Sequence, residues 1–157
     1  PEKIHLLGIR ILESHFETTD EYLTKPSPPV KTNVQVGQAP GFDMDNNIYF
    51  VKLDVILTGL NENEKPLGLN AQYVIHFAFQ VDNLKELVHV ENNNTTIDNR
   101  LGATIIGMAY STARGIVLER TQGTFFNGAI LPVINVGDFL KNTVPADQAE
   151  PVKSPTE

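Results

Sequence analysis

Apolar and polar residues alternate along two stretches in the first half of the chain. Residues 48–58 and residues 69–81 each carry apolar side chains at the odd-numbered positions. Side chains of a strand point to opposite faces in turn, so the pattern predicts two strands that each bury one face. The short polar stretch between them, residues 59–68, predicts that they pair as an antiparallel hairpin.

The segments before this hairpin are less regular. Residues 4–16 are rich in Ile and Leu at even and odd positions alike, which predicts a strand that contacts protein on both faces. Residues 18–31 are polar and hold three prolines, which predicts a long loop. A short strand at residues 32–36 and a turn at residues 39–41 are expected next.

Residues 101–120 form the strongest helical pattern of the chain, and Thr96 or Asp98 is suited to cap it. Two apolar stripes run along this helix, one through Ile105 and Met108 and one through Ile106 and Val117. The helix also holds three glycines, each of which costs a helix roughly 1 kcal/mol relative to alanine. A helix covered on two sides by closely packed neighbours would explain both features.

One sheet covers only one of these stripes, so we expect a partner helix from another subunit on the other. The residues predicted at this oligomer interface are Leu101, Ile105, Gly107, Met108, Ser111, Thr112 and Gly115. In the alternative, a C-terminal helix of the same chain covers the second stripe.

The stretch 123–140 is apolar but broken by glycine, asparagine and proline, so neither a long helix nor a regular strand fits it. Phe139 and Leu140 are expected in a short second helix. The apolar residues before them either pin a loop to the core or remain exposed as a binding surface.

Composition limits the possible functions. The chain has 157 residues, 41% hydrophobic and 20% charged, with a net charge of −7 and no cysteine. We expect one domain at residues 1–144 and a polar, disordered tail at residues 145–157. The acidic balance argues against a nucleic-acid partner, and no apolar run approaches the ~20 residues of a membrane span.

No catalytic or metal-binding motif is complete. Asp43, Asp45 and Asn47 have the spacing of the first calcium-loop ligands, but Ile48 stands where such a loop needs glycine, so a polar turn is expected. The four histidines have no zinc-protease spacing, and neither a phosphate loop nor a nucleophile elbow is present. We therefore expect no enzyme, no metal and no cofactor.

Residues 101–133 resemble the long helix and following loop of the SecB protein-export chaperones. The similarity lies in Leu101-Gly102-Ala103, Ala113-Arg114, Gly123-Thr124-Phe125 and Pro132-Val133. Residues 4–17 fit the first strand of that family, and residues 51–59 and 73–81 fit its third and fourth strands.

The resemblance implies an α+β fold, with a four-stranded antiparallel sheet and two helices packed on one face. It also implies a cytoplasmic homotetramer, a dimer of dimers, that binds unfolded preproteins in hydrophobic grooves and keeps them competent for export. The grooves would be lined by the loop after the first strand and the loop between the helices. The corresponding residues are Tyr22, Leu23, Phe125, Phe126, Ile130, Leu131 and Val133.

In the family, acidic residues on the outer face of the sheet meet the SecA motor, and Glu13 matches one such position. A second acidic position, on the fourth strand, falls near Ala71 and is not kept, and the tail differs from the family's motor-contacting end. Two further functions stay open. One is a SecB-like chaperone dedicated to a single partner such as an antitoxin, and the other is a small-ligand binding domain.

Overall fold

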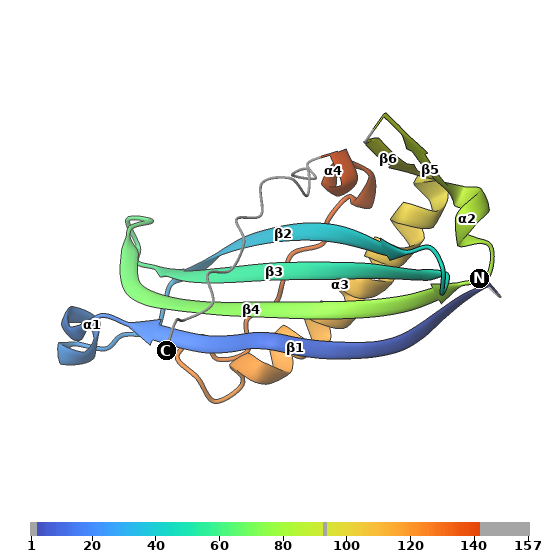
Figure 1. Ribbon diagram of the computed structural model, residues 1–157. Coiled ribbons are helices and arrows are strands. Elements are labelled where there is room, and N and C mark those ends of the chain that lie inside the picture. Colours follow the sequence, from blue (N-terminus) through green and yellow to red (C-terminus); the bar gives the residue numbers. More distant parts are fainter. Residues whose placement is uncertain (1–2, 93, 142–157) are drawn as a thin grey trace, which may run out of the picture.

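A single antiparallel sheet organises the molecule (Figure 1). The computed structural model describes residues 3–92 and 94–141. The four strands lie in the order β1-β4-β3-β2, so β1 and β2 are the edges of the sheet. In chain order the elements are β1 (Ile4–Thr18), α1 (Asp20–Thr24), β2 (Lys31–Asp43), β3 (Ile48–Leu60), β4 (Pro66–Val81), α2 (Leu84–Leu87), β5 (Val88–Glu91), β6 (Asn94–Ile97), α3 (Asn99–Thr121) and α4 (Val136–Lys141).

The two predicted alternating strands are β3 and β4, and they form the centre of the sheet. Their apolar faces are buried from Tyr49 to Leu57 on β3 and from Leu69 to Val81 on β4. The pairing of Leu53 with Ile75 places both side chains on this face, since directly opposed residues of antiparallel strands point the same way. The hairpin and its buried face are confirmed.

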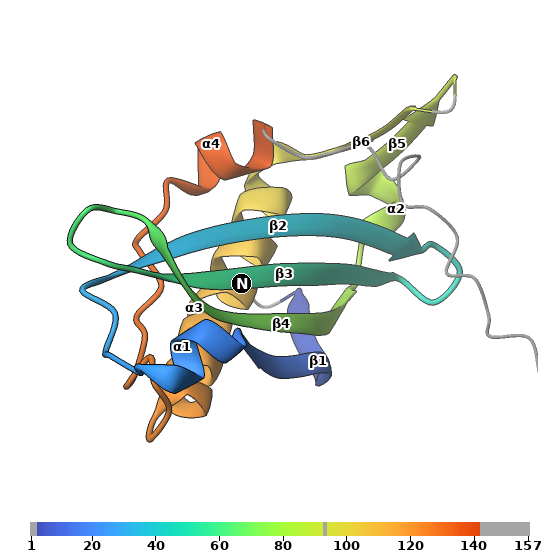
Figure 2. The same ribbon diagram turned by 90° about the vertical axis from the view of Figure 1, so that its left-hand side faces the viewer.

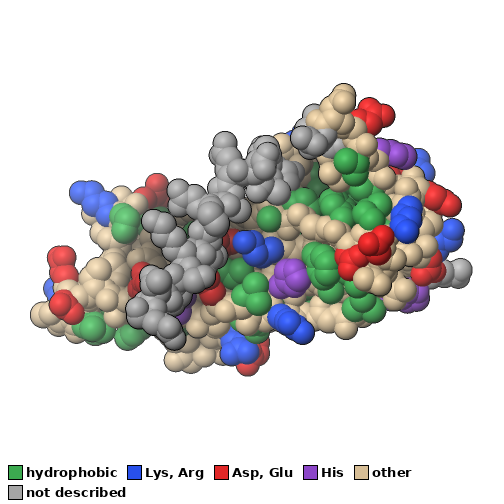
Figure 3. Space-filling view, viewed as in Figure 1, with side chains coloured by type: hydrophobic (Ala, Val, Ile, Leu, Met, Phe, Trp, Pro, Cys, Tyr) green, Lys and Arg blue, Asp and Glu red, His purple; other side chains and the backbone are tan. Residues whose placement is uncertain are grey.

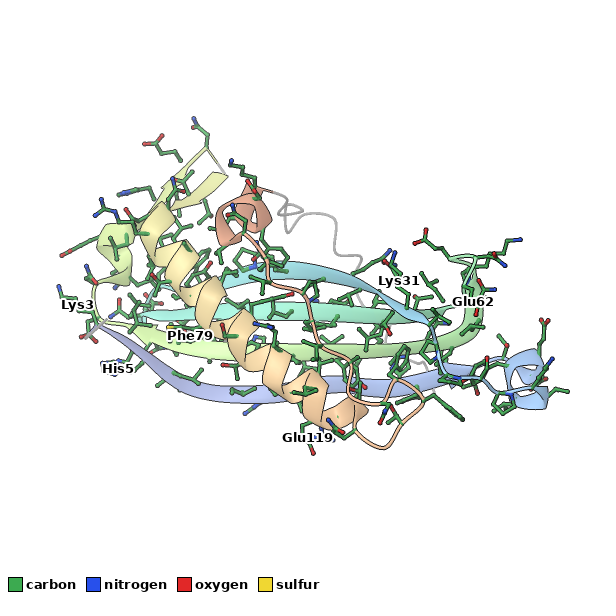
Figure 4. The ribbon with its side chains drawn as sticks, turned by 180° about the vertical axis from the view of Figure 1, so that it is seen from behind. Lys3, His5, Lys31, Glu62, Phe79 and Glu119 are labelled. Carbon is green, nitrogen blue, oxygen red and sulfur yellow. The ribbon has the colours of Figure 1, made fainter. Side chains whose placement is uncertain are left out.

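Helix α3 covers that face (Figure 4). Asp98 caps it, because its carboxylate accepts hydrogen bonds from the Arg100 and Leu101 backbone N–H groups at 3.0 and 3.1 Å. Ile106, Ala109, Ala113 and Val117 are fully buried against the sheet. By length and composition the helix could cross a membrane, contrary to the expectation that no apolar run approaches such a span. The buried core helix of a soluble protein shares this property.

The chain after α3 returns along this helix. The Tyr110 hydroxyl donates to the Pro132 carbonyl at 2.8 Å, and Arg114 Nε donates to the Leu131 carbonyl at 3.1 Å. The Phe139 ring of α4 then packs 6.0 Å from the Tyr110 ring. The expected short helix with Phe139 and Leu140 is therefore confirmed, and α4 contacts α3.

Three expectations about the irregular segments were wrong. Strand β1 does not contact protein on both faces, because it is an edge strand whose leucines are exposed. Residues 39–41 form no turn but lie inside β2, where Pro40 is opposite Val51, so β2 is much longer than expected. The loop after β1 begins with α1, which Thr19 caps. The segment after α2 forms the hairpin β5–β6. The predicted tail at residues 145–157 lies outside the described residues.

Tyr49 makes the stability of the fold sensitive to alkali. Its ring is 1% exposed and stacks on Phe42 at 4.8 Å, and burial raises its pKa to about 12. The unfolded chain loses the phenol proton near its ordinary pKa of 10. Between pH 10 and pH 12 the folded state therefore holds more protons than the unfolded state, and the free energy of unfolding falls as pH rises.

We expect Tyr49→Phe to keep the neutral-pH stability and to lose less stability than the parent protein between pH 10 and pH 12. Urea denaturation at a series of pH values measures the difference. Identical slopes for the two proteins would show that Tyr49 does not carry this pH dependence.

Candidate functional site

An aromatic hollow opens at the end of the molecule where β1 runs into α1. It holds about 360 Å³ and is lined by Phe16, Gly123, Thr124 and Phe125. Phe16 comes from β1, and the other three residues come from the loop after α3. Figure 2, which faces this end, shows α1 and the loop after α3 lying together. The sequence-predicted loops, residues 18–31 and residues 123–133, are therefore neighbours.

Two aromatic contacts join these segments. The Tyr22 and Phe125 rings meet edge to face at 5.3 Å, and the Phe16 and Phe126 rings are 5.8 Å apart. The Tyr22 hydroxyl donates to the Ser27 carbonyl at 2.8 Å, which fixes this side chain on α1 and the turn behind it. Phe125 remains 44% exposed and Phe126 only 6%. One phenylalanine thus anchors the loop and the other faces solvent.

Thr121 holds the loop in this position. The Thr121 hydroxyl donates to the Val117 carbonyl and accepts from the Ala129 N–H, both at 2.8 Å. Its carbonyl accepts from the Gly128 N–H at 3.1 Å and from the Thr124 hydroxyl at 2.7 Å. Gly128 has a φ of +81°, which favours glycine, and a side chain there would strike Gln122. Local hydrogen bonds therefore preform the loop that presents Phe125.

Seven residues were predicted to bind a client, and the structure divides them. Leu23, Phe125, Ile130 and Val133 are exposed, with exposed fractions from 44% to 84%. The other three, Tyr22, Phe126 and Leu131, are buried, so the prediction that they face a client is corrected: they support the exposed residues from below.

Part of the apolar surface was missed by the sequence interpretation. Leu6, Ile9 and Phe16 of β1 pair with the inward-facing residues of β4, yet α3 covers β3 and β4 and leaves them exposed. Irregular pairing between Leu6 and Gly8, and again between Ile11 and Glu13, adds the exposed Leu7 and Leu12 to this edge. The signal was present in the sequence as apolar residues at both even and odd positions.

The residues of the predicted oligomer interface on α3 are likewise partly buried and partly exposed. Leu101 and Ile105 are buried within the protomer, which corrects their assignment to a contact between subunits. Met108, Ser111 and Gly115 are exposed on the opposite side of the helix, and Gly107 and Thr112 lie partly exposed beside them. A side chain added at Gly115 would meet nothing within 4 Å, so close packing inside the protomer does not require glycine at this position.

The remaining candidates carry no catalytic arrangement. Glu13 is exposed on the sheet face opposite α3, whereas Ala71 is buried on the α3 side. A side chain at position 71 therefore could not contact a partner on the outer face. Asp43 accepts hydrogen bonds from the Asn46 side chain and from two backbone N–H groups, which lowers its pKa and confirms the predicted polar turn. Within residues 3–92 and 94–141, no group of three or more metal-ligating side chains comes together.

No protein-family model matches the chain, and no curated protein matches it in a sequence search. Among solved structures, the fold is similar to the SecB-like chaperone of Mycobacterium tuberculosis in complex with a ChAD peptide from the HigA1 antitoxin. That match has a TM-score of 0.59 and 16% identity over 85% of this chain and 92% of the other. A protein of unknown function from Streptococcus agalactiae matches with a TM-score of 0.42 and 10% identity over 83% of this chain and 97% of that one.

We expect Thr121→Val to destabilise the loop, because the Ala129 N–H would remain buried without an acceptor. The expected loss is about 1–3 kcal/mol of unfolding free energy. Thr104→Val is the matched control, since the Thr104 hydroxyl also donates to a helix carbonyl but is exposed. Chemical denaturation measures both variants, and equal effects would contradict the anchoring role of Thr121.

The chain thus has a SecB-like fold, built on a four-stranded antiparallel sheet whose apolar hollow is held open by its own loop.

Proposed function

We propose that the protein is a chaperone that holds unfolded polypeptides by their apolar segments and keeps them competent for export. The observation that carries this proposal is the exposed Phe125, fixed beside the aromatic hollow by a preformed loop. An apolar side chain that is fully buried gains roughly 1.5–3 kcal/mol relative to exposure. A micromolar complex needs about 8 kcal/mol, so several such contacts would have to act together.

The spacing of the exposed residues suits an extended client. Leu23 follows Tyr22, whose ring contacts Phe125, and the exposed Ile130 and Val133 follow along the segment that returns past α3. Each of these exposed residues can contact one apolar side chain of the client, and the hollow can hold a larger one. Such recognition depends on apolar character rather than on one sequence.

A second form of this function has independent support. The M. tuberculosis chaperone with the similar fold was solved with a peptide from an antitoxin, a single defined partner. A client dedicated to this protein in the same way is the alternative, and it would use the same exposed residues. A small-ligand binding domain fits less well, because the hollow is shallow and open and such ligands are usually enclosed.

We further propose that the chain assembles as a cytoplasmic homotetramer, a dimer of dimers. Two apolar surfaces remain uncovered on the protomer. One is the exposed apolar edge of β1, which includes Leu6 and Leu12, and the other is the side of α3 that includes Met108 and Gly115. Exposed apolar patches of this kind favour association. Glu13, exposed on the opposite sheet face, would be free to contact a motor such as SecA in that assembly.

Phe125→Ser should weaken client binding without unfolding the protein. We expect it to lose most of the suppression of aggregation, measured by light scattering of several unrelated unfolded proteins. Val90→Ser, which removes an even more exposed apolar side chain on the β5–β6 hairpin, should retain suppression. Phe126→Ser should lower stability by several kcal/mol, roughly as for other buried phenylalanines.

If Phe125→Ser and Val90→Ser suppress aggregation equally well, the hollow is not the client site. Activity toward one client alone would favour the dedicated chaperone.

Gly115→Leu separates folding from assembly. Leucine is a better helix former than glycine by roughly 1 kcal/mol, and the position is open, so the protomer should be as stable or more so. The larger side chain should break the close contact between subunits, which native mass spectrometry would detect as a shift from four chains of 17.4 kDa to smaller species. Gly115→Ala is the control that should keep the assembly. A parent protein that is monomeric at working concentration would refute the tetramer.

A further inference from the structure

Basic side chains cross the outer face, which we define as the sheet face that points away from α3. Arg10 is opposite His76, and His76 is opposite Lys52, so these side chains form one row across β1, β4 and β3. We name them the basic row. Figure 3 views this face and shows Lys and Arg side chains gathered beside a His near its middle. None of the ion pairs among the described residues includes Arg10 or Lys52. The row is a local exception in a chain whose net charge is −7.

A hollow adjoins the basic row. It holds about 300 Å³ and is lined by Ala39, Pro40, Gly41, Phe50, Lys52 and His76. The Phe50 ring stacks on the His76 ring at 5.2 Å with an interplanar angle of 20°, so one wall of the hollow is a flat aromatic pair. The small residues of β2 form its floor. An apolar group fits there beside a positive charge.

Small residues also leave this part of the sheet unusually bare. The row next to the basic row consists of Gly8, Ala78, Phe50 and Gly41. A Cβ atom built at Gly8 meets nothing within 4 Å, and at Gly41 it meets only Phe50 at an ordinary 3.6 Å. Glycine inside a strand costs roughly 0.5–1 kcal/mol relative to alanine. Gly8 lies beside the irregular pairing of β1, a common place for glycine, whereas Gly41 lies in regular pairing. Glycines inside strands also occur where another backbone approaches closely.

The row on the other side of the basic row is acidic, and it limits where a ligand can lie. Glu13, Val74 and Asp54 form this row, and the Asp54 carboxylate is held by the Gln72 amide at 3.0 Å. Rows are roughly 7 Å apart along the strands. A negative group is therefore repelled from the Asp54 side and attracted on the Phe50 side, over the glycines and the hollow.

We propose that the outer face binds an acidic, extended segment of a partner protein. Its carboxylates contact Arg10 and Lys52, its backbone crosses the bare row at Gly8 and Gly41, and one apolar side chain occupies the hollow beside Phe50. A peptide fits better than a small anion, because the site spreads across four strands and the hollow is too open to enclose a small ligand. This surface is separate from the aromatic hollow, so a client and this partner can be bound at once.

The test uses labelled peptides that share one framework of serine and leucine and differ only in having Glu, Gln or Lys at fixed positions. Fluorescence anisotropy with the full chain should show binding of the Glu peptide, weaker by about tenfold or more for the Gln and Lys peptides. Arg10→Glu and Lys52→Glu should each weaken binding of the Glu peptide by a similar factor. Lys65→Glu, the same charge change on the distant β3–β4 turn, should leave its binding unchanged.

A steric variant guards against a purely nonspecific charge effect. Gly8→Val places a side chain in open space, so we expect it to fold normally and to block the peptide. Equal binding of the Glu and Gln peptides, or full binding by Gly8→Val, would overturn the proposal. So would loss of Glu-peptide binding in Phe125→Ser, because the peptide would then be held as a client at the aromatic hollow. Loss of client binding in Phe125→Ser with Glu-peptide binding intact supports two independent surfaces.

Discussion

The structure depends on the need to cover one apolar face of a four-stranded sheet with one long helix. β3 and β4 present unbroken apolar rows from Tyr49 to Leu57 and from Leu69 to Val81, and α3 buries them. A helix with its side chains is about 10 Å wide, roughly two strand spacings. The apolar residues of β1 therefore remain at its margin. The exposed apolar residues of β1 are thus the part of the sheet that this one helix does not reach.

The loop after α3 shows how a polar group determines which apolar groups stay outside. Thr121 is the buried polar residue of the described core, and its hydrogen bonds to Val117 and Ala129 fix the path of the chain past Gly128. Once this path is set, Phe126 must point to Phe16 and Phe125 must point away from the core. Two adjacent identical residues thus acquire different roles from the path of the loop, which the Thr121 hydroxyl helps to fix.

Strong periodicity in the sequence predicted the centre of the fold, and weak periodicity failed at its edges. The alternation of β3 and β4 and the stripe of α3 through Ile106 and Val117 come from burial, so the sequence records them directly. The extent of β2 was missed because Pro40 and Gly41 are typical of turns, although an edge strand tolerates both. The doubled apolar pattern of β1 was correctly linked to a strand but wrongly to contact on both faces.

The candidate site was predictable by segment but not by residue. The sequence named the loops at residues 18–31 and 123–133, which meet through Tyr22 and Phe125. It could not separate Phe125 from Phe126, or Ile130 from Leu131, since that choice depends on hydrogen bonds that fix the path of the loop, such as those of Thr121 and Arg114. The basic row was invisible for a related reason: Arg10, Lys52 and His76 are far apart in the chain and meet only through strand register.

The two irregular pairings of β1 and the proline of β2 have a consequence for self-protection. The open sheet has two borders, β1 and β2, on which other extended chains could add as further strands. Pro40 offers no N–H on one border, and the bulges beside Leu7 and Leu12 interrupt the other. An arbitrary extended segment finds no continuous ladder on either side, whereas a copy with the same interruptions can match them. These interruptions therefore protect the sheet against uncontrolled growth by added strands.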